Sequence, residues 1–215
     1  MPNPSFPPGT LDPEGAPLWI AELAAYDPNH ALHVVRGLEP AQALDALGVK
    51  PHLVQPCELP AGKPDEWTSL PAAALGVEPG TAAALVAGRV GEWTFVYDDS
   101  GHTVSGEETA ALSTGGRTAA TSVFTINGDA NLTFAVDGED LAHVDIDDLD
   151  LTESLPDLPA ELRTAFEVAG TVELDDLEPG EPDYDVLMRA VCALAGLTFT
   201  PGELRRLPLL GATLG

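Results

Sequence analysis

Two turn signals, Asn127-Gly128 and Asp137-Gly138, limit what the middle of this chain can fold into. Asn-Gly and Asp-Gly pairs adopt the left-handed conformations that tight hairpin turns require. Residues 131–136, between the two signals, alternate apolar and polar side chains, as a half-buried strand does. Residues 117–126 and 141–146 flank them with further strand-forming sequence. The pattern predicts a three-stranded antiparallel meander.

Short periodic segments surround this meander. Apolar spacing and flanking Pro and Gly residues predict helices at 17–26, 39–48, 69–76, 106–112, 160–169 and 184–197, and strands at 31–37, 83–89 and 92–97. Asp183 is the expected N-cap of the last helix. The fold class expected is therefore α+β, an antiparallel β-sheet containing the meander and flanked by several short helices. Residues 1–16 are expected to form a disordered or surface-draped arm, and residues 17–215 a single domain.

The size and cysteine content of the chain favour a core that needs no cross-link. Of the 215 residues, 44% are hydrophobic, which suffices for a large buried core. Cys57 and Cys192 lie far apart in the sequence and form no CxxC motif, which favours two free thiols over one structural disulfide. No motif predicts a cofactor.

The charge balance restricts the partners of the protein. The formal net charge is −26, which repels nucleic acid and anionic membranes and admits a basic protein as partner. Residues 137–185 contain 18 acids and one base, so the acidity is concentrated in this stretch. The N-terminal sequence lacks the features of a signal peptide and no apolar run is long enough to span a bilayer, so a cytoplasmic location is expected. Few lysines with abundant Ala, Gly and Pro suggest a GC-rich genome, which alone would explain part of the acidity.

Three stretches resemble a known family. They are Ala31–Gly48, with Val-Arg-Gly-Leu before a helix, Gly91–Gly101, with Glu92-Trp93 opening a strand, and Ala111–Asn127, with Ala-Leu-Ser-Thr-Gly before the meander. Together they resemble an uncharacterised family of actinobacterial proteins, a domain of unknown function. This chain has Gly116 where the family pattern has threonine. The resemblance implies one domain and an actinobacterial host, and it implies no chemistry.

The motifs that would indicate metal or nucleotide chemistry are missing. The acidic run Asp145–Asp150 begins like a calcium loop, but Asp150 stands where an EF-hand needs glycine and Pro156 where it needs glutamate. Weak calcium binding by the carboxylates is the alternative to a solvated acidic rim. The five histidines show no metal-ligand spacing, and no Walker or dinucleotide motif is present. We therefore predict no metal site.

Two surfaces remain as candidate sites. The first is an acidic interaction face made of Asp137, Glu139, Asp140, Asp145, Asp147, Asp148 and Asp150. It predicts a non-enzymatic interaction protein, of an immunity or inhibitory type, that binds a basic protein. The second is a ligand pocket at the sheet lined by Arg36, Arg117 and Asp98, which would suit a small-molecule sensor or a small enzyme. Acidity that reflects genome bias alone is the third possibility.

Overall fold

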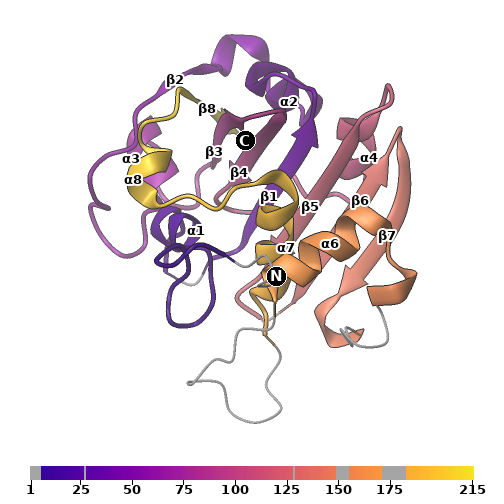
Figure 1. Ribbon diagram of the computed structural model, residues 1–215. Helices are drawn as coiled ribbons and strands as arrows, with labels where there is room; N and C mark the ends of the chain where they lie inside the picture. The colour runs from indigo at the N-terminus through magenta and orange to yellow at the C-terminus, as the bar shows by residue number, and fades with distance from the viewer. Residues whose placement is uncertain (1–5, 27, 128, 149–154, 171–182) are drawn as a thin grey trace.

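An eight-stranded antiparallel sheet forms the centre of the protein. The computed structural model describes residues 6–26, 28–127, 129–148, 155–170 and 183–215. Across the sheet the strands follow the order β2-β8-β3-β4-β1-β5-β6-β7 (Figure 1). Their bounds are β1 His30–Arg36, β2 Gln55–Cys57, β3 Ala83–Val90, β4 Trp93–Asp98, β5 Thr118–Phe124, β6 Ala130–Val136, β7 Glu139–Asp145 and β8 Leu209–Leu214. The α+β fold class expected from the sequence is confirmed.

The predicted meander is formed by β5, β6 and β7. Thr121 of β5 lies opposite Thr133 of β6, which lies opposite His143 of β7. The register shifts between Phe134 and Ala135, so β7 carries a bulge. Asp137, in the turn before β7, has a φ of 53°, a left-handed conformation that Asp tolerates better than most residues. Gly128 of the other turn lies outside the described residues.

Short helices cover both faces of the sheet. Their bounds are α1 Leu18–Leu23, α2 Pro40–Ala46, α3 Leu70–Leu75, α4 Glu108–Ser113, α6 Ala160–Ala169, α7 Val186–Ala195 and α8 Pro201–Leu204, with 3-10 turns at Pro51–Leu53, Ile146–Asp148 and Leu155–Asp157. The larger hydrophobic cluster contains side chains of α1, α3, α6, α7 and α8, and the smaller one contains those of α2 and α4. Each of these helices therefore contributes buried apolar side chains to the core on one face of the sheet.

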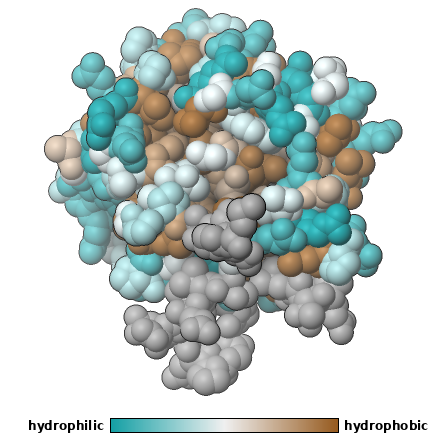
Figure 2. Space-filling model, viewed as in Figure 1, coloured by the Kyte–Doolittle hydropathy of each residue, from teal (hydrophilic) through white to brown (hydrophobic). Residues whose placement is uncertain are grey.

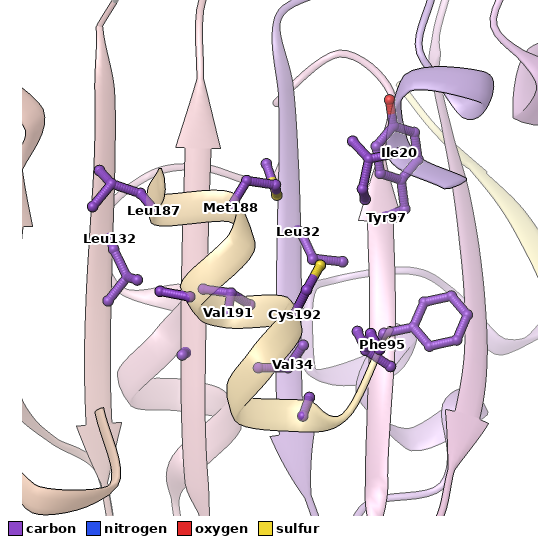
Figure 3. Close-up of a cluster of buried hydrophobic side chains, with 14 of the residues drawn as sticks. Ile20, Leu32, Val34, Phe95, Tyr97, Leu132, Leu187, Met188, Val191 and Cys192 are labelled. Carbon is purple, nitrogen blue, oxygen red and sulfur yellow. The ribbon is translucent and has the colours of Figure 1, made fainter. Parts of the chain in front are cut away.

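Helix α7 provides the centre of the larger cluster. In Figure 3, Leu187 lies beside Leu132 of β6, and Met188 and Cys192 lie over β1 near Leu32. Val191, Val34, Phe95 and Tyr97 belong to the same cluster. The apolar repeat at helical spacing explains why this segment forms a helix with one fully buried side. Beside it, the indole Nε1 of Trp19 donates a hydrogen bond of 3.1 Å to the carbonyl of Leu197. This bond anchors α1 to the chain that leaves α7.

The start of α7 differs from the sequence-based expectation. Asp183 was expected to cap this helix, but the N-cap is Asp185 and no side chain accepts a capping hydrogen bond there. Instead, the carboxylate of Asp183 pairs with the buried guanidinium of Arg189. A buried arginine requires a counter-charge more than a helix end requires a cap, because an unpaired buried charge is the costlier defect.

The segment after α8 forms an interior strand. Strand β8 lies between β2 and β3, so Leu209 faces Cys57 on one side and Leu210 faces Ala87 on the other. Cys57 and Cys192 are both free and buried, as expected from their separation. Burial raises the pKa of both thiols, which makes them inert packing groups.

The described part of the N-terminal arm, residues 6–16, folds back on itself ahead of α1. Leu11 forms an isolated bridge with Pro17, and the backbone amide of Leu18 donates to the carbonyl of Thr10. Thr10 is buried. On the face of the molecule seen in Figure 2, hydrophobic residues gather near the centre and hydrophilic residues occupy most of the rim.

Candidate functional site

The exposed acids of the meander line one edge of the sheet. Strand β7 is last in the strand order, at the outer margin in Figure 1, so one side of its backbone has no strand beside it within the described ranges. Five acids on β7 and beside it are exposed: Asp137, Glu139, Asp140, Asp145 and Asp147. A strand rises about 3.3 Å per residue, so Glu139 and Asp145 are about 20 Å apart along the edge. Asp148 ends a 3-10 turn, and Asp150 lies outside the described residues.

Four arginines in the described part of the chain are paired with acids outside the β7 edge. In the part of the chain that the structure describes, the ion pairs are Arg36–Glu161, Arg89–Glu39, Arg189–Asp183 and Arg205–Glu22. None of the five exposed acids of the β7 edge takes part in them. The acids of the β7 edge therefore form a line of negative charge, and none of the arginines in these four ion pairs neutralises it. Such charges repel the same edge of a second copy and so oppose pairing between identical strands.

The three residues expected to line a pocket are not brought together. Arg36 lies opposite Trp93 at one end of β1, whereas Asp98 lies opposite Ala31 at the other end. The guanidinium of Arg36 stacks 4.6 Å from the centre of the Trp93 ring and pairs with Glu161 at 3.1 Å. These contacts occupy Arg36 in packing α6 against the sheet.

Arg117 closes a turn beside α4. Its Nε donates a hydrogen bond of 3.2 Å to the carbonyl of Leu112, and an outer nitrogen donates to the hydroxyl of Thr114. Arg117 also precedes β5, at the same end of the sheet as Arg36. The side chain therefore stabilises the connection between α4 and β5.

Asp98 anchors a buried chain of hydrogen bonds on the α4 side of the sheet. Its carboxylate accepts from the amide and the hydroxyl of Thr103, each at 2.7 Å. The ring of His33 lies 2.7 Å from the Thr103 hydroxyl and 2.9 Å from the Thr121 hydroxyl. Thr109 donates to Thr121 at 2.7 Å. Every member of the chain is buried.

The direction of these bonds fixes the tautomer of His33. The hydroxyl group of Thr103 donates its single hydrogen to Asp98, so its oxygen can only accept a hydrogen bond from the imidazole. The Nε2 atom of His33 therefore carries the hydrogen. The Nδ1 atom is then the acceptor for Thr121. Burial lowers the pKa of His33 to about 4, against the opposing influence of Asp98 and Glu108, and the ring is neutral at pH 7. With all partners satisfied, this chain is structural.

The neighbouring carboxylate, Asp99, faces a cleft on the other side. The cleft has a volume of about 380 Å³, a size typical of small-ligand sites. Asp99 accepts from the hydroxyl of Ser69 and, at 2.8 Å, from the amide of Ala84. Its pKa is raised, chiefly by burial and partly by Asp98, although the two hydrogen bonds oppose this. A carboxyl group with a raised pKa in a cleft marks a candidate binding site.

Asp98 and Asp99 are consecutive in the sequence, but Asp98 belongs to the buried chain of hydrogen bonds and Asp99 lines the cleft. Side chains of consecutive residues in extended backbone point to opposite faces, which explains their separation. Ser69 and Trp67 also line the cleft of Asp99, although Ser69 precedes Asp99 by 30 residues. Nothing in the sequence indicated that they would lie together. Within the described ranges, no three His, Cys, Asp or Glu side chains are grouped as a metal site would need.

The architecture defines the protein as an α+β protein whose antiparallel sheet is covered by short helices on both faces. Comparison with known families places it more narrowly. Residues 17–199 match the family of unknown function DUF6461, and the chain belongs to that family. The resemblance to an uncharacterised family is thereby confirmed, while the actinobacterial host stays a prediction.

Other comparisons add no relative. No curated protein and no solved structure shows significant similarity to this chain. Among the helices that the structure describes, none is both long enough and apolar enough to cross a membrane.

Proposed function

We propose that this protein is a non-enzymatic interaction protein that binds a basic protein partner through the acidic edge of its sheet. The observation that supports the proposal is the geometry of β7, whose acids are exposed along an open strand edge. The ion pairs of the described chain lie elsewhere. Lysine and arginine side chains of a partner would supply the missing counter-charges.

The acidic edge favours a particular mode of binding. Charges aligned along a strand attract a cationic surface over several ångströms and orient it before contact. The open backbone of β7 then offers hydrogen bonds to an extended segment of the partner, as in strand addition. A protein that blocks a basic enzyme or toxin, in the manner of an inhibitor or immunity protein, needs both properties. The partner in this proposal is a protein and not a nucleic acid, since nucleic acid phosphates would be repelled.

A charge-matched pair of variants tests the proposal. The edge variant carries Glu139→Gln, Asp140→Asn, Asp145→Asn and Asp147→Asn. The control variant removes the same charge from exposed acids elsewhere, with Asp45→Asn, Glu58→Gln, Glu92→Gln and Glu107→Gln. Each tagged protein is used to capture partners from a lysate of the source organism at low and high salt, and the captured proteins are identified by mass spectrometry.

The proposal expects a basic protein to be retained by the wild type and by the control variant, and lost by the edge variant. Retention should weaken as salt rises, because long-range attraction between exposed charges is screened within about 10 Å at 0.1 M salt. Equal loss from both variants would indicate that only the total charge matters, which contradicts the proposal. A partner retained by the edge variant would also contradict it.

A further inference from the structure

The cleft beside Asp99 has walls of a distinct chemical character. It lies where the chain enters α3, at the turn that precedes β3 and at the turn that follows β4, away from the β7 edge. Its lining includes Trp67, Ser69, Asp99, His102 and Glu78. Among the lining residues that the structure describes, none is lysine or arginine. The cleft therefore combines two carboxylates and an aromatic ring with no fixed positive charge.

The carboxylate of Asp99 is held in place and retains acceptor capacity. Ser69 is the N-cap of α3: its oxygen accepts from the amide of Ala72 while its hydroxyl donates to Asp99. The amide of Ala84 donates to the other carboxylate oxygen. A carboxylate accepts up to about four hydrogen bonds, so each oxygen keeps room for another donor. Two rigid elements, the start of α3 and the start of β3, thus fix an anion that a ligand can reach.

Trp67 forms an aromatic wall that the protein leaves exposed. Its side chain is 57% exposed and meets Tyr26, 58% exposed, edge to face with ring centres 5.3 Å apart. The Asp65 carboxylate accepts from the amides of Trp67 and Thr68, both at 2.9 Å, which fixes the backbone under the ring. Two large rings that are ordered by local bonds yet face solvent are unusual for packing alone. They suit recognition of a cation by the face of the indole.

We propose that this cleft binds a small organic cation bearing N–H donors, a primary ammonium or guanidinium group. The charged nitrogen donates to Asp99 close to the face of the Trp67 indole, the apolar chain of the ligand lies against the same ring, and Glu78 adds negative potential to the cleft. An anionic ligand finds no counter-charge among these walls, and a neutral one would leave the charge of Asp99 without a partner. The site is independent of the acidic edge, so either can fail without the other.

The test uses n-butylammonium as the probe and two comparators of similar size. Choline keeps a positive charge but has no N–H donor on nitrogen, and n-butanol keeps the chain but has no charge. Binding is followed by amide and indole NMR shifts. Acrylamide quenching provides a second readout, because Trp19 and Trp93 are buried and Trp67 is the accessible tryptophan. We expect the amine to shift Ser69 and Asp99 resonances and to shield Trp67.

Three variants locate the effect. Asp99→Asn should weaken n-butylammonium binding by about tenfold or more, since it removes a charge-assisted bond. Trp67→Ala, at an exposed position, should weaken it by about two- to fivefold. Glu92→Gln, an exposed acid outside the cleft, removes the same charge as Asp99→Asn and should leave the affinity unchanged.

Several results would overturn the proposal. One is the absence of saturable NMR shifts on titration with n-butylammonium. Another is an equal response to n-butanol or choline. A third is that Glu92→Gln lowers the affinity for n-butylammonium as much as Asp99→Asn does. If Asp99→Asn unfolds, Trp67→Ala decides the matter, because an unchanged affinity in this variant would place the amine elsewhere.

Discussion

The guanidinium of Arg189 is fully buried and forms an ion pair with Asp183, six residues earlier on the chain. Arg189 also donates to the carbonyls of Gly15, Ala169 and Gly170, at 3.0, 3.2 and 3.1 Å. One side chain thereby joins the N-terminal segment, the end of α6 and the start of α7. It also connects the two flanks of residues 171–182, which lie outside the described chain.

Removing this side chain should cost a large part of the folding free energy. We expect Arg189→Met to lower the free energy of unfolding by about 3–5 kcal/mol, because Asp183 and three carbonyls lose a buried donor. Arg89→Met, in an exposed pair with Glu39, should cost about 1 kcal/mol or less. Urea denaturation of both variants checks the contrast, and similar losses would contradict it.

Asp185 should make the protein less stable as the pH rises toward neutrality. Burial, reinforced by repulsion from Asp12, Asp183 and Glu14, raises its pKa to about 7 although Arg189 opposes the shift. The folded protein therefore holds a proton that the unfolded chain has released above pH 4, and stability is lost between about pH 4 and 7. We expect Asp185→Asn to raise the free energy of unfolding at pH 8 by roughly 1–3 kcal/mol.

The comparison of pH values isolates this effect of Asp185. At pH 4 the same substitution should change stability little, because the native carboxyl is already protonated there. Denaturation curves at the two pH values, with the exposed Asp45→Asn as control, measure the difference. A gain at pH 4 equal to that at pH 8 would show that titration is not its cause.

His33 should make the free energy of unfolding fall more steeply as the pH is lowered, which is opposite in sign to the effect of Asp185. Burial lowers the pKa of His33 from 6.5 to about 4. Between these two pH values the unfolded chain binds a proton at this residue and the folded protein does not. The stability associated with neutral His33 is complete above pH 6.5 and is lost as the pH falls toward 4, by roughly 3 kcal/mol. We expect His33→Gln to flatten the dependence of unfolding free energy on pH in this window. An unchanged slope would contradict the assignment.

Gly88 should tolerate no side chain. A Cβ atom there would lie 2.6 Å from Cζ of Phe95 and 2.8 Å from Cδ2 of Leu209, both in the core cluster under α7 and α8. We expect Gly88→Ala to destabilise the protein by about 1–3 kcal/mol through overpacking. Gly62→Ala meets no atom within 4 Å and serves as the control. Thermal unfolding of both variants measures the difference. Equal melting temperatures for Gly88→Ala and Gly62→Ala would contradict the prediction.

The parts of the fold predicted from sequence are those that local chemistry determines. The meander followed from two turn signals and from alternation, both of which act over a few residues. Strand β8 was not among the predicted strands, because Leu209–Leu214 contains Gly211 and pairs with β3, which is more than a hundred residues earlier. Pairing over such a separation leaves no periodic trace in one sequence.

The candidate sites show the same division. The acids of the β7 edge could be located from the sequence, since an acidic strand after a turn leaves few places for its side chains. The environment of Arg36 could not, because its partner Glu161 lies 125 residues away in the sequence. Arg117 and Asp98 bond to residues within five positions, but those local bonds leave no periodic pattern in the sequence. The cleft at Asp99 depends on Ser69 and Trp67 reaching the end of β4, which only the tertiary structure brings about.

The position of β8 has a consequence for biosynthesis. During synthesis, β3 and β4 emerge from the ribosome long before residues 209–214. Until β8 is made, the backbone of β3 has no strand paired on the side opposite β4. An unpaired apolar strand is the kind of surface that nascent chains expose to chaperones or to one another. Completion of the sheet therefore depends on the strand translated after all the other strands described here.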